Sequence, residues 1–130
     1  MAGIVVDTSV LIGYFAGDPA QLLKEAAVHG GLILPPLVVA EAFSGDMLPN
    51  ERFALGELLQ EAPVHGTPLG HWLDVGNLRR SLRRKGVNVS LPDAHIAQCA
   101  LELDAVLFTR DAVFTYIAQH TALRVTSAAS

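Results

Sequence analysis

The segment GIVVDTSVLIGYF, residues 3–15, runs from a short apolar strand into a polar corner. Ile4–Val6 is a β-branched run without a polar residue, which is typical of a strand buried on both faces of a parallel sheet. Asp7 stands where that strand ends, and Thr8 and Ser9 follow it. An acid at this point is either a turn residue at the strand exit or a group that takes part in chemistry.

Similar apolar segments alternate with helical ones along the rest of the chain. Val64 and His65 form a possible short strand, and Asn50 is the expected N-cap of the fourth helix. The other predicted strands are 32–35, 105–109 and 123–126, and the predicted helices are 10–15, 21–28, 37–43, 50–62, 69–86, 90–103 and 112–120. Apolar strands separated by helices predict an α/β fold, with a parallel sheet covered by helices on both faces.

Three more acids fall where such a sheet places its ligands, outside the carboxyl ends of the strands. Asp111 follows the strand at 105–109, Asp93 lies in the first turn of the helix at 90–103, and Glu41 lies early in the helix at 37–43. A helix that follows a parallel strand begins at the edge where that strand ends. Asp7, Glu41, Asp93 and Asp111 can therefore converge.

Each acid alone also has a structural explanation. Ser90 and Asp93 fit a helix cap, Asp111 is a natural N-cap, Asp7 suits an Asx-turn and Glu41 is a good helix former. Together the four are harder to explain in this way, because two carboxylates about 4 Å apart repel by roughly 1 to 4 kcal/mol. Such a cluster must protonate, separate or bind a cation.

Oxygen ligands without thiols suit Mg²⁺ or Mn²⁺. Phosphodiester hydrolysis assisted by a bound cation is the chemistry that such a site supports. No Ser-His-Asp arrangement can be identified, and no glycine-rich phosphate loop follows the first strand. The five histidines show no paired spacing typical of a zinc site, so we interpret them as surface or core residues; they are His29, His65, His71, His95 and His120.

The charge of the chain is unevenly distributed. The formal net charge is −4, but residues 79–85, RRSLRRK, hold five of the nine basic residues. These residues are Arg79, Arg80, Arg83, Arg84 and Lys85. Such a basic run is either a solvated helix face or a surface that attracts a polyanion.

Length and composition predict one soluble domain over residues 1–130. Hydrophobic residues make up 51% and charged residues 17% of the 130, and Cys99 is the single cysteine. No apolar run approaches the length that a bilayer requires, and the N-terminal segment has no basic stretch of the signal-peptide kind. A cytoplasmic location without membrane attachment is therefore expected.

Four motifs in order resemble a PIN-domain ribonuclease: Asp7-Thr8-Ser9 after an apolar strand, an isolated Glu41, GVNVSLPDAHIAQCA with Asp93, and FTRDAVF with Asp111. Their spacing and the chain length are similar to the VapC toxins of bacterial type II toxin–antitoxin pairs. The resemblance implies a three-layer α/β/α sandwich with a short parallel central sheet. It also implies a metal-dependent endoribonuclease with an acidic pocket for Mg²⁺ or Mn²⁺.

The resemblance extends to individual residues and to partners. The acidic quartet corresponds to Asp7, Glu41, Asp93 and Asp111, with Thr109, Ser9 and, less closely, Thr8 as supporting hydroxyl residues. A homodimer, or a heterotetramer or larger assembly with a cognate VapB-like antitoxin, is implied, as is a structured RNA substrate. The basic run 79–85 then becomes a candidate contact to the RNA backbone.

Two other functions compete with the nuclease. The first is a degenerate PIN domain that binds RNA or a protein without cutting, but a pure binder gains nothing from acids that repel phosphate. The second is a phosphate-handling α/β enzyme, which needs a second acid beside Asp7 or two residues from it. Thr8 and Ser9 supply neither.

Overall fold

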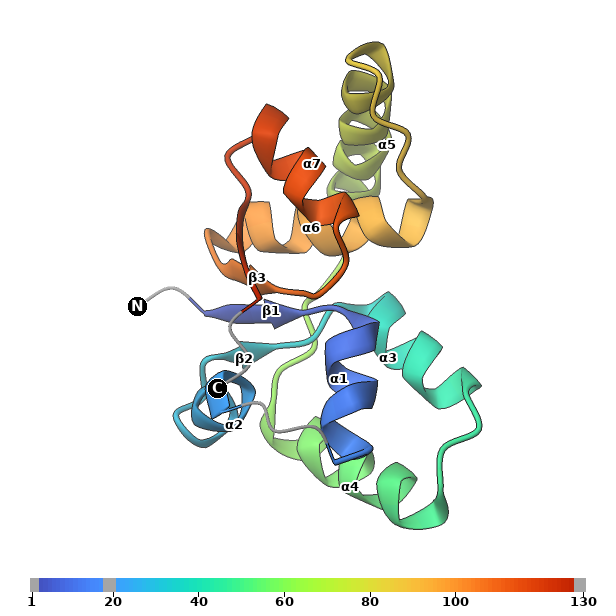
Figure 1. The fold of residues 1–130 in the computed structure, drawn as a ribbon, viewed down its shortest axis with the longest axis vertical. Coiled ribbons are helices and arrows are strands. Elements are labelled where there is room, and N and C mark those ends of the chain that lie inside the picture. Colours follow the sequence, from blue (N-terminus) through green and yellow to red (C-terminus); the bar gives the residue numbers. More distant parts are fainter. Residues whose placement is uncertain (1–2, 18–20, 128–130) are drawn as a thin grey trace.

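The computed structural model describes residues 3–17 and 21–127, and its centre is a four-stranded parallel sheet. The strands are β1 (Ile4–Val6), β2 (Leu32–Ile33), β3 (Val106–Phe108) and β4 (Arg124–Thr126), in the order β2-β1-β3-β4. Because β1 and β3 are the inner strands, both edges of each are paired, and the helices on either side of the sheet cover their faces (Figure 1). Val5, Val6, Leu107 and Phe108 are accordingly buried.

Helices cover both faces of the sheet. They are α1 (Thr8–Phe15), α2 (Gln21–Val28), α3 (Pro36–Ser44), α4 (Pro49–Glu61), α5 (Leu69–Arg84), α6 (Leu91–Leu103) and α7 (Val113–His120). Figure 1 shows α5, α6 and α7 on one side of the sheet and α1, α2 and α4 on the other. The predicted three-layer α/β/α sandwich with a short parallel sheet is confirmed.

Prolines and caps shift several boundaries from their predicted positions. The second strand is only two residues long, because Pro35 precedes α3 and Pro36 opens it, and neither can donate to a sheet. The predicted N-cap at Asn50 is wrong: α4 begins at Pro49, a favoured first position for proline. The predicted strand at Val64 is an isolated bridge to Leu34.

The register between β1 and β3 places Asp7 beside Thr109. Val6 pairs with Phe108, so the residues that follow them, Asp7 and Thr109, leave the sheet side by side. The Asp7 N–H donates to the Phe108 carbonyl at 3.3 Å and extends the pairing by one residue. The carboxyl edge of the sheet thereby joins two segments that are 102 residues apart in sequence.

The longest described helix, α5, has 16 residues and carries most of the basic run. It packs against α6 and ends at Arg84, and Gly86, two residues later, has a φ of +85°, a conformation that favours glycine. Within the described residues, no helix is long and apolar enough to cross a membrane.

Candidate active site

Asp7 is the buried centre of the candidate site. As the N-cap of α1, its Oδ1 accepts hydrogen bonds from the Val10 N–H at 3.0 Å and from the Ser9 hydroxyl at 2.9 Å. Its Oδ2 accepts a hydrogen bond from the Thr109 hydroxyl at 2.5 Å. An ionised carboxylate offers about four acceptor positions, so one is left for a further partner such as a cation. The side chain is thus held in one orientation by the first turn of α1 and by the residue that follows β3.

Thr109 connects Asp7 to the acid that follows β3. The Thr109 hydroxyl donates to Asp7 and accepts a hydrogen bond from the Asp111 N–H at 3.0 Å. Asp111 is exposed, and its Oδ1 accepts from the Val113 N–H at the start of α7 at 3.0 Å. The predicted N-cap at Asp111 is wrong, because the N-cap of α7 is Ala112; Asp111 instead accepts from the residue after the cap. Asp111 also lies at the carboxyl edge of the sheet beside Asp7 and Thr109, which we call the acidic edge.

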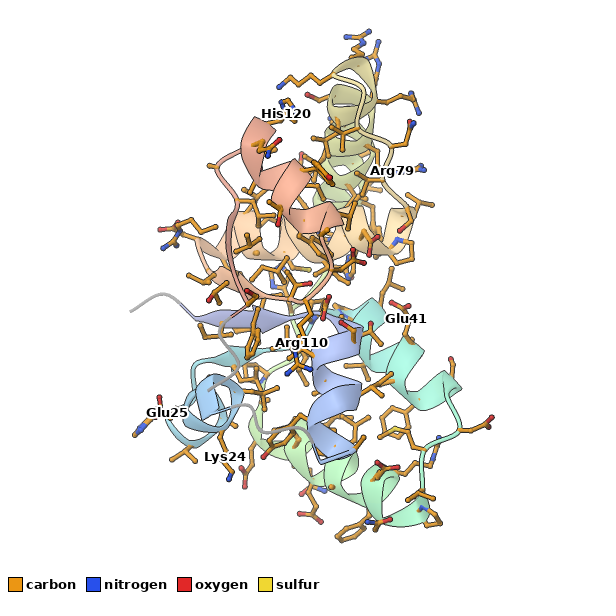
Figure 2. All side chains as sticks on the ribbon, viewed as in Figure 1. Lys24, Glu25, Glu41, Arg79, Arg110 and His120 are labelled. Atoms are coloured by element: carbon orange, nitrogen blue, oxygen red, sulfur yellow. The ribbon has the colours of Figure 1, made fainter. Side chains whose placement is uncertain are left out.

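Glu41 is brought to the same edge by α3. It is exposed, and its Oε1 accepts a hydrogen bond from the Thr8 hydroxyl at 3.1 Å. Figure 2 shows Glu41 on α3, near the middle of the molecule and close to the sheet. Thr8, the weakest of the three hydroxyl candidates from sequence, is thus the residue that contacts Glu41, whereas Ser9 and Thr109 contact Asp7.

Asp93 completes the set from the first turn of α6. Its N–H donates to the hydroxyl of the N-cap residue Ser90 at 3.2 Å. Burial raises the pKa of Asp93 above its ordinary value, although the Ser90 hydrogen bond opposes the rise. The charges of Asp111, Glu41 and Asp7 raise the pKa further, so Asp93 lies within electrostatic reach of all three. The four predicted acids therefore lie near enough to one another for the charges of three to affect the fourth.

The donors of this site fit a hard divalent cation. All four side chains supply carboxylate oxygens, which Mg²⁺ and Mn²⁺ prefer, and the hydroxyls of Thr8, Ser9 and Thr109 orient two of the acids. The charges of Asp111, Glu41 and Asp7 add to the rise in the pKa of Asp93 that burial causes, and a bound cation relieves repulsion of this kind.

Four of the five basic residues in the run 79–85 are exposed at the C-terminal end of α5, and the fifth is hydrogen-bonded within the chain. Arg80, Arg83, Arg84 and Lys85 are exposed. Arg79 instead donates from Nε to the Val89 carbonyl at 2.8 Å and holds the loop that leads to α6. Figure 2 shows Arg79 on α5, in the half of the molecule opposite Lys24.

Sequence reasoning missed a second polar group of side chains between α5 and α6. It consists of His65, His71, His95, Cys99 and Glu102, and we call it the histidine cluster. Part of its signal is readable in sequence, because His95, Cys99 and Glu102 are spaced four and three residues apart and share one face of a helix. The approach of His65 and His71 depends on how α5 packs against α6.

A family model described as PIN domain matches residues 4–119. Among solved structures, a chain of DNA-bound VapBC from Salmonella typhimurium is 20% identical with a TM-score of 0.79, covering 97% of this chain and 98% of that one. A chain of VapBC2 from Rickettsia felis, bound to a promoter DNA fragment, is 18% identical with a TM-score of 0.76, covering 95% and 96%. A chain of VapBC-1 from nontypeable Haemophilus influenzae is 22% identical with a TM-score of 0.71 and the same coverage. No curated protein matches the chain significantly.

Proposed function

Since this chain belongs to the PIN-domain family, we propose that it is a metal-dependent endoribonuclease, the toxin of a type II toxin–antitoxin pair. The observation that supports the proposal is the fixed Asp7 carboxylate, held by three hydrogen bonds at the carboxyl edge of the sheet, together with Glu41 and Asp111, whose charges and that of Asp7 act on Asp93. A degenerate, non-catalytic PIN domain would have no use for this repulsive arrangement.

The residues that would hold Mg²⁺ or Mn²⁺ are Asp7, Glu41, Asp93 and Asp111. When bound, the cation supplies activation of water and neutralises charge that develops on the phosphate. Asp7 contributes a fixed oxygen, because Ser9, Val10 and Thr109 prevent its carboxylate from rotating. Exposed Glu41 and Asp111 leave the site open toward solvent, where a phosphodiester can approach.

A cleavage assay with and without a divalent cation tests the proposal. We expect the purified full chain to cut structured RNA internally in Mg²⁺ or Mn²⁺, to stop when excess EDTA is added, and to recover when the cation is restored. Gel analysis of end-labelled RNA measures the products. Cleavage that continues in EDTA would contradict the metal requirement, and cation-independent RNA binding without cleavage would favour the degenerate domain.

The basic run is proposed to contact the RNA backbone. Changing Arg80, Arg83, Arg84 and Lys85 to glutamine should weaken RNA binding and reduce its salt dependence, because each lost phosphate contact lowers the slope of log K against log[salt] by about 0.7. Fluorescence anisotropy at several salt concentrations measures that slope. Lys24→Gln, on the exposed part of α2, is the matched control and should leave it unchanged. An unaltered slope in the fourfold variant would make the run a solvated helix face.

A VapB-like antitoxin is the proposed protein partner, because the compared structures include VapBC complexes. An apolar groove of about 400 Å³ between α1, α2 and α4 offers a surface for such a chain. Tyr14, Phe15 and Leu58 line it, and Phe53 at its edge is 70% exposed. Assembly as a homodimer, or as a heterotetramer or larger complex with the antitoxin, belongs to the same proposal, as does a location in the cytoplasm.

A further inference from the structure

The histidine cluster is a largely buried set of polar groups that the proposed nuclease does not use. His71 is 3% exposed, and His95 and Cys99 are both fully buried. His65 is partly buried and Glu102 is the most exposed member, so the cluster reaches the surface at one end. Trp72 stacks on the His95 ring at 4.9 Å between centroids and covers it.

Hydrogen bonds assign the proton positions in the metal-free cluster. The Leu37 N–H donates to Nε2 of His95 at 3.4 Å, so the His95 proton is on Nδ1 and is donated to Nε2 of His71 at 2.7 Å. The His71 proton is then on Nδ1 and is donated to Oε1 of Glu102 at 2.8 Å. The Nε2–H of His65 donates to the other carboxylate oxygen, Oε2, at 2.8 Å. Two ring nitrogens therefore point at one carboxylate.

We propose that the histidine cluster binds a zinc-class transition-metal ion, with His65, His71 and Cys99 as ligands. Glu102, whose carboxylate is hydrogen-bonded to both imidazoles, would have to move toward the ion to become the fourth. One ligand atom from each of the first three residues lies within 4.8 Å of the others. Two imidazoles, a thiolate and a carboxylate are ligands that Zn²⁺ accepts in a tetrahedral site. With Zn–N of about 2.0–2.1 Å and Zn–S of about 2.3 Å, tetrahedral donors lie about 3.3–3.6 Å apart, so a pair of donors would have to approach by up to about 1.5 Å.

The proton positions can adjust to metal binding, and the one donor left facing another donor is the Leu37 N–H, opposite the protonated Nε2 of His95. Binding at Nδ1 of His71 moves that ring's proton to Nε2, which then donates to Nδ1 of His95. The His95 proton moves to Nε2, which faces the Cys99 sulfur at 3.9 Å and donates to its thiolate. Only the long hydrogen bond from the Leu37 N–H is given up. The Cys99 thiol releases one proton, and His71 gains the outer hydrogen bond that metal-bound histidines make.

This site is separate from the acidic edge in place and in chemistry. Asp93 and Cys99 are six residues apart on α6, which is about 9 Å along the helix axis. The acidic edge supplies only oxygen donors and suits Mg²⁺ or Mn²⁺, whereas nitrogen and sulfur donors favour Zn²⁺ and Co²⁺. Metal in the histidine cluster would join α5, α6 and the segment that contains His65.

Cobalt titration of the Asp7→Asn/Asp93→Asn double variant tests the site independently of nuclease activity. We expect one Co²⁺ per chain, a tetrahedral visible spectrum and a sulfur-to-cobalt charge-transfer band, with Zn²⁺ displacing the Co²⁺. Adding Cys99→Ser should remove the band and lower the affinity by about 100-fold or more, since even outer partners of a ligand contribute about 10- to 100-fold. His29→Gln, outside the cluster, is the matched control and should change neither the charge-transfer band nor the Co²⁺ affinity.

The zinc-loaded parent chain provides a second measurement if the cysteine variant does not fold. X-ray absorption at the zinc edge should show one sulfur scatterer and nitrogen neighbours. A shell of oxygen and nitrogen alone would overturn the proposal, as would Co²⁺ binding without a charge-transfer band or with an affinity that Cys99→Ser leaves unchanged. None of these results depends on whether the chain cuts RNA.

Discussion

Replacing Asp7 by asparagine is expected to abolish RNA cleavage while leaving the fold intact. The change removes the negative charge at the centre of the acidic edge, but asparagine keeps an oxygen for the Val10 N–H and the Ser9 hydroxyl. Because the partners of metal ligands alone contribute about 10- to 100-fold, loss of a ligand should lower the cleavage rate by more than about 100-fold. Initial rates on labelled RNA at saturating Mg²⁺ measure the effect.

The matched control is Asp46→Asn, an exposed aspartate two residues after α3 ends. It makes the same chemical change outside the acidic quartet and should retain the parent rate. Circular dichroism and urea unfolding should show that Asp7→Asn folds, with a stability change on the order of 1 kcal/mol from its altered hydrogen bond to Thr109. Cleavage by Asp7→Asn at the parent rate would remove Asp7 from the site and refute the quartet.

Acidification from pH 6.5 to pH 4 is expected to remove about 3 kcal/mol of folding stability through His95. Burial, and then the charges of His71 and His65, lower the pKa of His95 from 6.5 to about 4, while Glu102 opposes the shift. The unfolded chain therefore binds a proton at this histidine at a higher pH than the folded chain. The stabilisation is fully present above pH 6.5 and is lost as the pH falls toward 4. Urea unfolding at a series of pH values measures it.

Two other groups act in the same pH range and can be distinguished from His95. Burial raises the pKa of Glu102, but hydrogen bonds from His65, His71 and Gln98 lower it overall, so its contribution is also lost in acid. The raised pKa of Asp93 has the opposite sign and favours the folded chain as the pH falls. His95→Gln should flatten the dependence between pH 6.5 and 4, whereas His120→Gln, on the exposed end of α7, should not. If the unfolding free energy of His95→Gln falls with pH as steeply as that of the parent, the loss of stability in acid belongs to another group.

The sheet and the acidic edge could be predicted because both follow from topology. A strand without polar residues indicates burial between two neighbours, and the carboxyl ends of parallel strands share one edge whatever the helix packing. Asp7 and Asp111 could therefore be placed together from sequence alone. The predicted end of β2 and the predicted start of α4 are wrong although Pro35, Pro36 and Pro49 set them locally, because the prediction does not place Pro36 and Pro49 at the first helical position.

The finer contacts depend on rotation of the helices, which sequence does not supply. Whether Thr8 or Ser9 reaches Asp7 is set by the start of α1, and the structure directs Thr8 to Glu41 instead. The histidine cluster requires α5 to face α6 with His71 inward, and its His65–Glu102 contact spans 37 residues. Spacing within α6 indicates only the half of the cluster that this helix carries.

The pairing of β1 with β3 also determines when the acidic edge can exist. Asp7 and Thr109 are 102 residues apart, so their hydrogen bond forms only after most of the chain has been synthesised and the loop between them has closed. Contacts of such long range form late and slowly in folding. A growing chain that has released residues 1–100 from the ribosome carries three of the acids but neither Thr109 nor Asp111. The acidic edge, and with it the proposed catalytic site, is therefore completed only when the last third of the chain has folded onto the first.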